Sequence, residues 1–217
     1  MKRKVKVAFL DRDGVINSSQ INNGYIGLIK DFKWIKGSKK AIKYLKLKNY
    51  KIIIVTNQSG IARGYFSLRD VYKLHNYLKH ELKKFGVKVD KIYFCPYHKD
   101  GIIKKYSRNS VLRKPNIGMF NKAKKVYKID KKNSFIIGDQ NTDMQFAKKS
   151  LELSLPSFIN HVNRPTISNT ENMALAAHYS GKAISITKTN TRIQCIGLSF
   201  FTLGVENRFC ILVIDNV

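Results

Sequence analysis

The chain contains few cysteines and no long hydrophobic run. Its 217 residues include three cysteines, Cys95, Cys195 and Cys210, an odd number spaced far apart, so no disulfide framework is expected and a reducing compartment is indicated. No apolar run approaches the roughly 20 residues that span a bilayer, and the basic start of the chain leads into a short apolar stretch rather than a signal-peptide core. We therefore expect a cytoplasmic protein without a membrane partner.

Acidic residues are also few. The chain has 14 Asp and Glu against 41 Lys and Arg, a formal net charge of +27, and 36 of the basic residues lie before position 151. Such a charge favours anionic partners such as nucleic acid or phosphorylated substrates. Because the lysines are scattered without interleaved aromatic residues, we expect a solvated surface and no nucleic-acid partner. The change in composition predicts a domain over residues 1–149 and a separate segment over residues 150–217.

Short apolar runs alternate with helical patterns in the first 149 residues. The runs that predict buried parallel strands are residues 5–10, 52–55, 92–94 and 135–137. Apolar residues at helical spacing predict an amphipathic helix with Ser67 as its N-cap and Gly86 as its stop, and weaker patterns cover residues 38–48 and 117–127. The alternation predicts an α/β fold, an open parallel Rossmann-like sheet flanked by helices.

Carboxylates follow two of the predicted strands. Asp11 and Asp13 come after the first strand, and Asp139 and Asp143 after the fourth. Each of them, taken singly, suits a turn or helix cap. Open α/β sheets bind ligands at the carboxyl ends of their strands, and carboxylates that converge there usually require a hard cation such as Mg²⁺. The four together therefore predict a metal site.

Two further side chains suit a phosphoryl group. Thr56, after the second strand, offers a hydroxyl donor, and Lys114 offers a cation directly before Pro115, a residue that suits the first turn of a helix. A solvated lysine is the simpler interpretation of Lys114 alone, because the segment is rich in lysine. Its place at a predicted helix entrance favours a role in the site.

Four strings resemble the signature motifs of the haloacid dehalogenase-like phosphatase superfamily, in order and in register. They are DRDGVIN (11–17), VTNQSGIARGY (55–65), RKPNIGM (113–119) and GDQNTDM (138–144). Four motifs together are far more specific than one. Within the superfamily, the chain most resembles the D-glycero-D-manno-heptose 1,7-bisphosphate phosphatases. The resemblance implies a Mg²⁺-dependent phosphatase that removes one phosphate from a sugar bisphosphate, leaving heptose 1-phosphate, through an aspartyl-phosphate intermediate.

The resemblance also implies roles for individual residues. Asp11 is the expected nucleophile, and Asp13 is the expected general acid and base. Thr56 and Lys114 are expected to stabilise charge on the transferred phosphoryl group.

The implied ligands of Mg²⁺ are the carboxylates of Asp11 and Asp139 and the backbone carbonyl of Asp13, with Asp143 in support. The implied substrate-binding residues are Asn22, Asn23, Gly24 and Tyr25 over the sugar, Asn57, Gln58 and Ser59 near the transferred phosphate, and Arg113 at the second phosphate. A packed loop aromatic is an equally good interpretation of Tyr25.

The chain departs from the family at a structural zinc loop. Of the usual four ligands only Cys95 remains, because Tyr97 stands at the His position and Ser110 and Leu112 stand at two Cys positions. His98 is adjacent, but one thiolate and one imidazole do not complete a tetrahedral site. We therefore predict that structural zinc is absent.

Residues 150–217 are not recognised. A short helical pattern at 171–178 and strand-like stretches at 183–187, 195–203 and 209–214 predict a small β-rich unit. The alternative is a sequence not selected for this fold, such as a fused or shifted reading frame, which would explain the sudden loss of lysine.

Three alternative functions stay open at this point. A histidinol-phosphate phosphatase and a polynucleotide 3′-phosphatase have similar motifs, and a non-catalytic basic binding module on the same scaffold is also compatible with the charge. In the first interpretation the partner is a small molecule, a sugar bisphosphate, and we expect a monomer.

Overall fold

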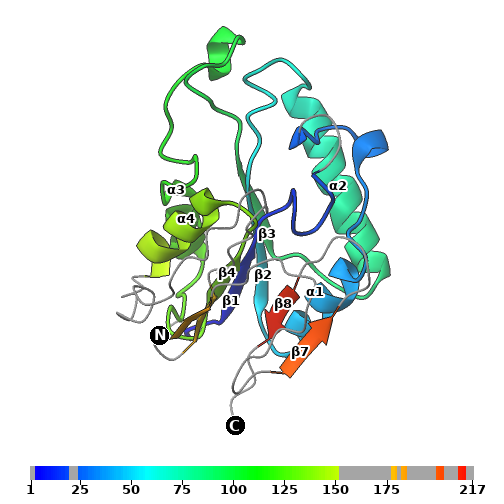
Figure 1. Ribbon diagram of the computed structural model, residues 1–217, viewed down its shortest axis with the longest axis vertical. Helices are drawn as coiled ribbons and strands as arrows, with labels where there is room; N and C mark the ends of the chain where they lie inside the picture. The colour runs from blue at the N-terminus through cyan, green and yellow to red at the C-terminus, as the bar shows by residue number, and fades with distance from the viewer. Residues whose placement is uncertain are drawn as a thin grey trace, which may run out of the picture.

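A four-stranded parallel sheet lies between two layers of helices (Figure 1). The computed structural model describes residues 3–19 and 24–151, together with four short strands farther along the chain. The sheet consists of β1 (Val7–Leu10), β2 (Lys51–Asn57), β3 (Lys91–Cys95) and β4 (Phe135–Ile137). The helices are α1 (Ser38–Leu47), α2 (Leu68–Lys84), α3 (Gly118–Val126) and α4 (Asn141–Leu151), with short 3₁₀ turns η2 (Ile29–Asp31) and η3 (Lys104–Tyr106).

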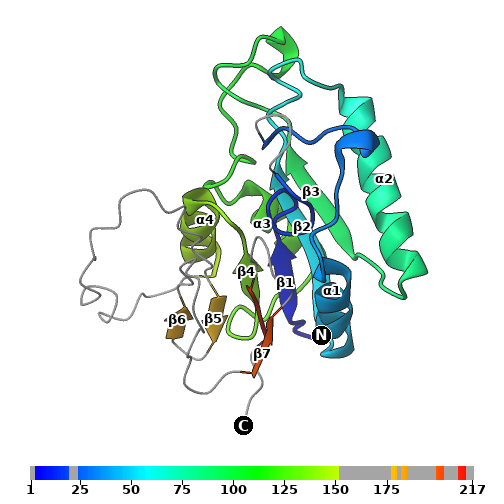
Figure 2. The ribbon, with the colours of Figure 1, turned by 45° about the vertical axis from the view of Figure 1, so that its right-hand side comes forward.

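The strand order is β3-β2-β1-β4, and all neighbouring pairs are parallel. The carboxyl ends of the four strands therefore meet at one edge of the sheet. The segments that follow β2 and β3 extend beyond this edge (Figure 2). This arrangement confirms the predicted open parallel α/β fold and places the predicted polar side chains on the same side of the molecule.

Both faces of the sheet are buried. Ala8 and Leu10 of β1 pack in the cluster that contains the apolar faces of α1 and α2, whereas Val7 and Phe9 pack with α3 and α4. Successive side chains of a strand point to opposite faces, so a strand that is covered on both sides requires a continuous apolar run. Burial on both sides explains why the strands contain continuous apolar runs, as in residues 52–55 of β2.

Helix α2 begins and ends as predicted. The hydroxyl of Ser67 accepts from the backbone N–H of Asp70, and the Asp70 carboxylate accepts from the backbone of Ser67, which forms a capping box. The helix is followed by Gly86 with φ of 80°, in the left-handed region that favours glycine.

Two helices differ from the sequence prediction. Helix α3 starts at Gly118, so Pro115 precedes its first residue by three positions instead of occupying the first turn, and the Lys114–Pro115 peptide bond is cis. Helix α4 is not predicted from the sequence, because it has only a few apolar residues on its buried side. Its residues Ser150 and Leu151 are buried, so the helix crosses the boundary predicted after residue 149, which itself stays a prediction.

The four short strands beyond residue 151 form two antiparallel pairs, β5 (Ala177–Tyr179) with β6 (Lys182–Ile184) and β7 (Ser199–Thr202) with β8 (Cys210–Val213). Strands β6, β7 and β8 overlap the three predicted strand-like stretches. The predicted helix at 171–178 is wrong at its end, where β5 begins, and residues 171–176 lie outside the described residues. Among the helices described, none combines the length and apolar character that crossing a membrane requires.

Candidate active site

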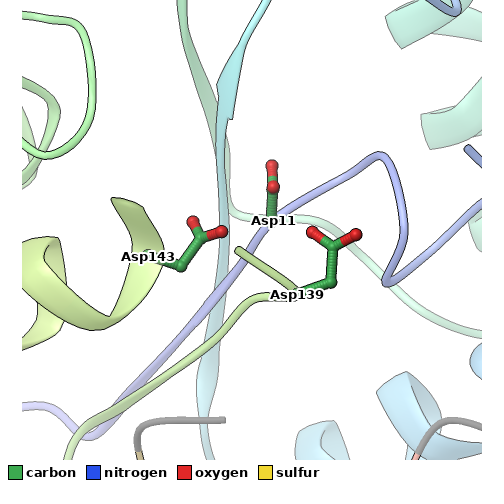
Figure 3. A group of neighbouring side chains, drawn as sticks. All are labelled: Asp11, Asp139 and Asp143. Atoms are coloured by element: carbon green, nitrogen blue, oxygen red, sulfur yellow. The ribbon is translucent and has the colours of Figure 1, made fainter. Parts of the chain in front are cut away.

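Three carboxylates from separate segments meet at the carboxyl edge of the sheet. Asp11 directly follows β1, Asp139 lies in the turn after β4, and Asp143 lies in the first turn of α4 (Figure 3). One oxygen of each carboxylate lies within 4.8 Å of the others. The structure thus brings together three of the residues that the sequence suggested as metal ligands.

Two glycines allow this close approach. A Cβ at Gly14, whose φ is +85°, would lie 1.9 Å from Oδ2 of Asp139. A Cβ at Gly138 would lie 2.2 Å from Cβ of Asp143. Larger residues at these positions would push the carboxylates apart, so both glycines belong to the construction of the site.

The carboxylates repel one another. Burial, followed by the charges of Asp11 and Asp143, raises the pKa of Asp139 to about 7. Burial and the charge of Asp11 likewise raise the pKa of Asp143 to about 6. Oδ1 of Asp139 is buried and has no hydrogen-bond partner among the described residues. Crowded, partly unpaired carboxylate oxygens are the donor set that Mg²⁺ prefers, so these residues fit a divalent cation.

Lys114 lies between two of the carboxylates. Its Nζ is 3.0 Å from Oδ2 of Asp11 and 2.5 Å from Oδ1 of Asp143, and the residue is only 2% exposed. Burial acts to lower the pKa of Lys114, but the two carboxylates outweigh it and the pKa is raised. The side chain therefore stays cationic, and the interpretation of Lys114 as a solvated surface lysine is wrong.

Asn57 fixes the backbone of Lys114. Its Oδ1 accepts from the Lys114 N–H at 3.0 Å, and its Nδ2 donates to the Lys114 carbonyl at 3.2 Å. The amide that was expected near the transferred phosphate thus also joins the end of β2 to the segment before α3. This double contact fixes where the ammonium group can reach.

The side chain of Asp13 lies outside the group of three carboxylates. Arg12 holds it in a two-point contact, Nε to Oδ1 at 3.0 Å and Nη2 to Oδ2 at 2.9 Å. Asn17 and Gln58 donate to the same carboxyl group at 2.9 and 2.8 Å. Burial raises the pKa of Asp13, the charge of Arg12 opposes this, and the net direction is upward. A fixed carboxyl group with a raised pKa is suited to accept and return a proton.

Gln58 links Asp13 to Thr56. Its Nε2 donates to the Thr56 hydroxyl oxygen at 2.9 Å as well as to Asp13. Since the hydroxyl oxygen of Thr56 accepts this bond, its hydrogen is available for an acceptor in the adjacent pocket. The structure places Gln58 as a buried connection between the two groups.

A pocket of about 220 Å³ opens beside these groups. Its walls come from the segments that follow β1, β2 and β4 and from the residues that precede α3. The lining residues are Asp11, Asp13, Gly24, Tyr25, Ile26, Thr56, Asn57, Gln58, Ser59, Gly60, Phe66, Arg113, Lys114, Gln140 and Thr142. All the expected substrate-binding residues that the structure describes are among them, while Asn22 and Asn23 lie outside the described residues.

Two lining residues have notable surroundings. The Tyr25 ring lies 4.7 Å from the Tyr65 ring and 5.9 Å from the guanidinium of Arg63, so it is both packed and at the pocket wall. Nη1 of Arg113 is buried without a hydrogen-bond partner in the described part of the chain, and burial lowers the pKa of Arg113. An unpartnered guanidinium donor beside the pocket is suited to an anionic group.

Several residues of the site were not predicted from the sequence. Arg12 and Asn17 are among them, although both lie within the first motif. Phe66 was also missed; its ring fills the space beside Gly60, where a Cβ would lie 2.3 Å from Cζ of Phe66. The position of Arg12 between two aspartates was the available signal for a buried ion pair. No sequence pattern around Phe66 indicated a role in the site.

The loop after β3, where the resemblance implies zinc ligands, is held by other contacts. Cys95 is buried, with its Sγ 3.7 Å from the Tyr97 carbonyl, and burial raises the pKa of its thiol. Nδ1 of His98 accepts from the Asp100 N–H at 3.1 Å, and Nε2 lies 3.3 Å from Nη2 of Arg63. The acceptor nitrogen of His98 is thus engaged by a backbone donor. The absence of zinc stays a prediction.

Comparison with known proteins identifies the family. The model of the polynucleotide kinase 3 phosphatase family matches residues 6–163. A D-glycero-alpha-D-manno-heptose-1,7-bisphosphate 7-phosphatase of Photorhabdus laumondii is 40% identical over 174 residues, which cover 80% of this chain and 92% of that protein. The corresponding beta-anomer 7-phosphatase of Rhodopseudomonas palustris is 40% identical over 70% of this chain and 81% of its own length.

A solved structure supports the same assignment. The D,D-heptose 1,7-bisphosphate phosphatase of B. bronchiseptica, in complex with magnesium and phosphate, is 30% identical and has a TM-score of 0.59, covering 67% of this chain and 76% of that one. The resemblance drawn from the four motifs is therefore confirmed over most of the chain. This chain belongs to the haloacid dehalogenase-like phosphatases, a group of phosphoric monoester hydrolases, and within them to the family of the heptose 1,7-bisphosphate phosphatases.

Proposed function

We propose that this enzyme is a Mg²⁺-dependent phosphatase that removes the 7-phosphate of D-glycero-D-manno-heptose 1,7-bisphosphate. The observation that carries the proposal is the placement of Asp11, which faces the pocket at the end of β1 while Lys114 contacts one of its oxygens. The relatives named as 7-phosphatases of the alpha and beta anomers supply the substrate class.

The carboxylates of Asp11 and Asp139 and the backbone carbonyl of Asp13 would hold Mg²⁺, with Asp143 in support. The buried, unpartnered oxygen of Asp139 and the raised pKa of its carboxyl group support this assignment. When bound, the cation supplies positive charge that allows an anionic nucleophile and a phosphate ester to approach each other.

In the first step, a carboxylate oxygen of Asp11 attacks phosphorus and the bond between phosphorus and the sugar oxygen breaks. Oδ1 of Asp11 accepts from the Arg12 N–H at 2.7 Å and Oδ2 contacts Lys114, so the nucleophile is held in one orientation. The protonated carboxyl group of Asp13 gives its proton to the departing sugar oxygen. The products of this step are the aspartyl-phosphate and the dephosphorylated sugar hydroxyl.

In the second step, the carboxylate of Asp13 takes a proton from water, and the water oxygen attacks phosphorus. The bond between phosphorus and Asp11 breaks, which restores the Asp11 carboxylate, the protonated Asp13 and free inorganic phosphate. Thr56 and Lys114 line the same part of the pocket and donate to the phosphoryl oxygens as charge develops there.

Arg113 is proposed to bind the phosphate that stays on the sugar. Its buried, unpartnered Nη1 lies at the pocket wall, and a guanidinium can contact a phosphate at two points. Gly24 and Tyr25 would lie along the sugar, and Ser59 near the transferred phosphate, as the resemblance implies.

A polynucleotide 3′-phosphatase is the second candidate, because the matching family model carries that description and the net charge is +27. The two functions are separated by measuring phosphate release from both heptose anomers and from a 3′-phosphorylated oligonucleotide, with ³¹P NMR to identify which phosphate leaves. We expect loss of the 7-phosphate and little reaction of the oligonucleotide. Preferred release from the oligonucleotide would contradict the first proposal.

A further inference from the structure

A fully buried arginine connects the acid and base group to helix α2. Arg12 is 0% exposed, and its Nε and Nη2 atoms hold both oxygens of Asp13. Nη2 also donates to Oε1 of Gln58 at 3.0 Å and to the carbonyl of Ile26. The remaining terminal nitrogen, Nη1, lies 3.1 Å from Nε2 of His75. The guanidinium group is therefore held from three directions.

His75 supports Arg12 from the opposite side to Asp13. It lies in α2, is 4% exposed, and its ring packs against Phe94 with the centroids 5.2 Å apart. A guanidinium has only donors, so Nε2 of His75 accepts the hydrogen bond and the hydrogen of the neutral ring is on Nδ1. Burial, together with the charge of Arg12, lowers the pKa of His75 to about 2, which keeps the ring neutral as this contact requires.

We propose that His75 is a positioning residue that fixes the direction of the Asp13 carboxyl group through Arg12. Loss of the Nε2 acceptor would leave Nη1 of Arg12 buried without the partner seen here, and buried donors without partners are costly. The guanidinium would then rotate toward another acceptor, and Asp13 would turn with it, because both its oxygens are bound to Arg12. The inference rests on the proposed role of Asp13 as general acid and base.

The inference predicts an effect that depends on the leaving group. The ratio kcat/KM covers the steps up to the departure of the leaving group, so it excludes the later attack of water. A sugar alkoxide needs a proton from Asp13 as it leaves, whereas p-nitrophenolate leaves readily without one. A displaced Asp13 should therefore lower kcat/KM for heptose 1,7-bisphosphate more than for p-nitrophenyl phosphate.

Two amide substitutions test whether the hydrogen-bond acceptor must lie at the position of Nε2 or whether any polar side chain is sufficient. The Gln side-chain oxygen reaches the place of Nε2, whereas the shorter Asn side chain reaches the place of Nδ1. The quantity compared is kcat/KM for the sugar ester divided by kcat/KM for the aryl ester. We expect His75→Asn and His75→Leu to lower this ratio by about tenfold, which is less than the full effect of general acid catalysis. His75→Gln should keep the ratio within about twofold of the original, and His80→Leu, an exposed position on the same helix, is the matched control.

Asp13→Asn is measured beside these variants. If it lowers the ratio while folded His75→Leu and His75→Asn do not, the inference about His75 is overturned and the role of Asp13 stands. If Asp13→Asn leaves the ratio unchanged, the proposed acid role itself fails, and the inference fails with it. Nitrogen-15 NMR of the wild-type imidazole at pH 7 gives a readout without turnover: a proton on Nδ1 of His75 is expected, and a proton on Nε2 would overturn the contact with Arg12.

Discussion

Replacement of Asp139 by Asn should stabilise the metal-free protein while removing its response to Mg²⁺. The carboxyl pKa is raised from 3.8 to about 7 by burial and by the neighbouring carboxylates. The protonated form therefore stabilises the fold at low pH, and that stability is lost as pH rises from about 4 to about 7. At pH 8 the ionised carboxylate costs on the order of 4 kcal/mol, because each pKa unit corresponds to about 1.4 kcal/mol.

An asparagine at this position is neutral at every pH, but its buried amide lacks partners, which costs about 1 to 2 kcal/mol. The expected net gain for Asp139→Asn in chelator at pH 8 is therefore about 2 kcal/mol, or roughly 4 to 8 °C in Tm for a domain of this size. The gain should be smaller at pH 5, where the native carboxyl group is mostly protonated.

The assay is thermal unfolding followed by circular dichroism at pH 5 and pH 8, with chelator and with Mg²⁺. Asp100→Asn, an exposed carboxylate outside the group, should behave as the wild type. The reasoning is refuted if Asp139→Asn is no more stable than the wild type in chelator at pH 8, or if Mg²⁺ raises the Tm of both proteins equally.

Four further outcomes are expected. Lys114→Met should lower turnover at least about a hundredfold and destabilise the metal-free fold by about 3 kcal/mol, measured by phosphate release and urea unfolding; near-normal values would contradict its placement. Binding of Mg²⁺ near pH 6.5 should release protons, since the pKa values of Asp139 and Asp143 are about 7 and about 6, and calorimetry in buffers of different ionisation heat would show it. Ser67→Ala should cost about 1 kcal/mol in urea unfolding without changing turnover. A chain shortened to residues 1–151 should keep turnover, because every described site residue and α4 are retained; a folded but inactive product would argue against that.

Features determined by local sequence were predictable. The strands are continuous apolar runs because helices cover both faces of the sheet, and this pattern is visible in the sequence alone. Helix α2 carries both its cap, Ser67, and its stop, Gly86, within the chain segment itself. The aspartates were found because the carboxyl ends of parallel strands meet at one edge, so the strand positions place Asp11 and Asp139 at the same edge of the sheet. That β1 and β4 are neighbours comes from the structure.

Contacts between distant segments were not predictable. His75 and Arg12 are 63 positions apart, and no sequence pattern around either residue indicates that the two are in contact. The contact of the Asn57 amide with the Lys114 backbone also spans 57 positions. Such pairs depend on how α2 and the segment before α3 pack on the sheet, which residue spacing does not encode. For the same reason, the sequence identified the reacting groups but not the side chains that hold them.

The most direct test of the account is the release of inorganic phosphate from D-glycero-D-manno-heptose 1,7-bisphosphate by the wild type and by Asp11→Asn, each with Mg²⁺ and with chelator. Asp11 is 6% exposed, and asparagine has the same size and shape as aspartate. Circular dichroism should therefore show the same fold for the wild type and for Asp11→Asn. The account predicts release of one phosphate by the wild type with Mg²⁺ and none in the other three conditions. Turnover by folded Asp11→Asn, or undiminished release by the wild type in chelator, would contradict it.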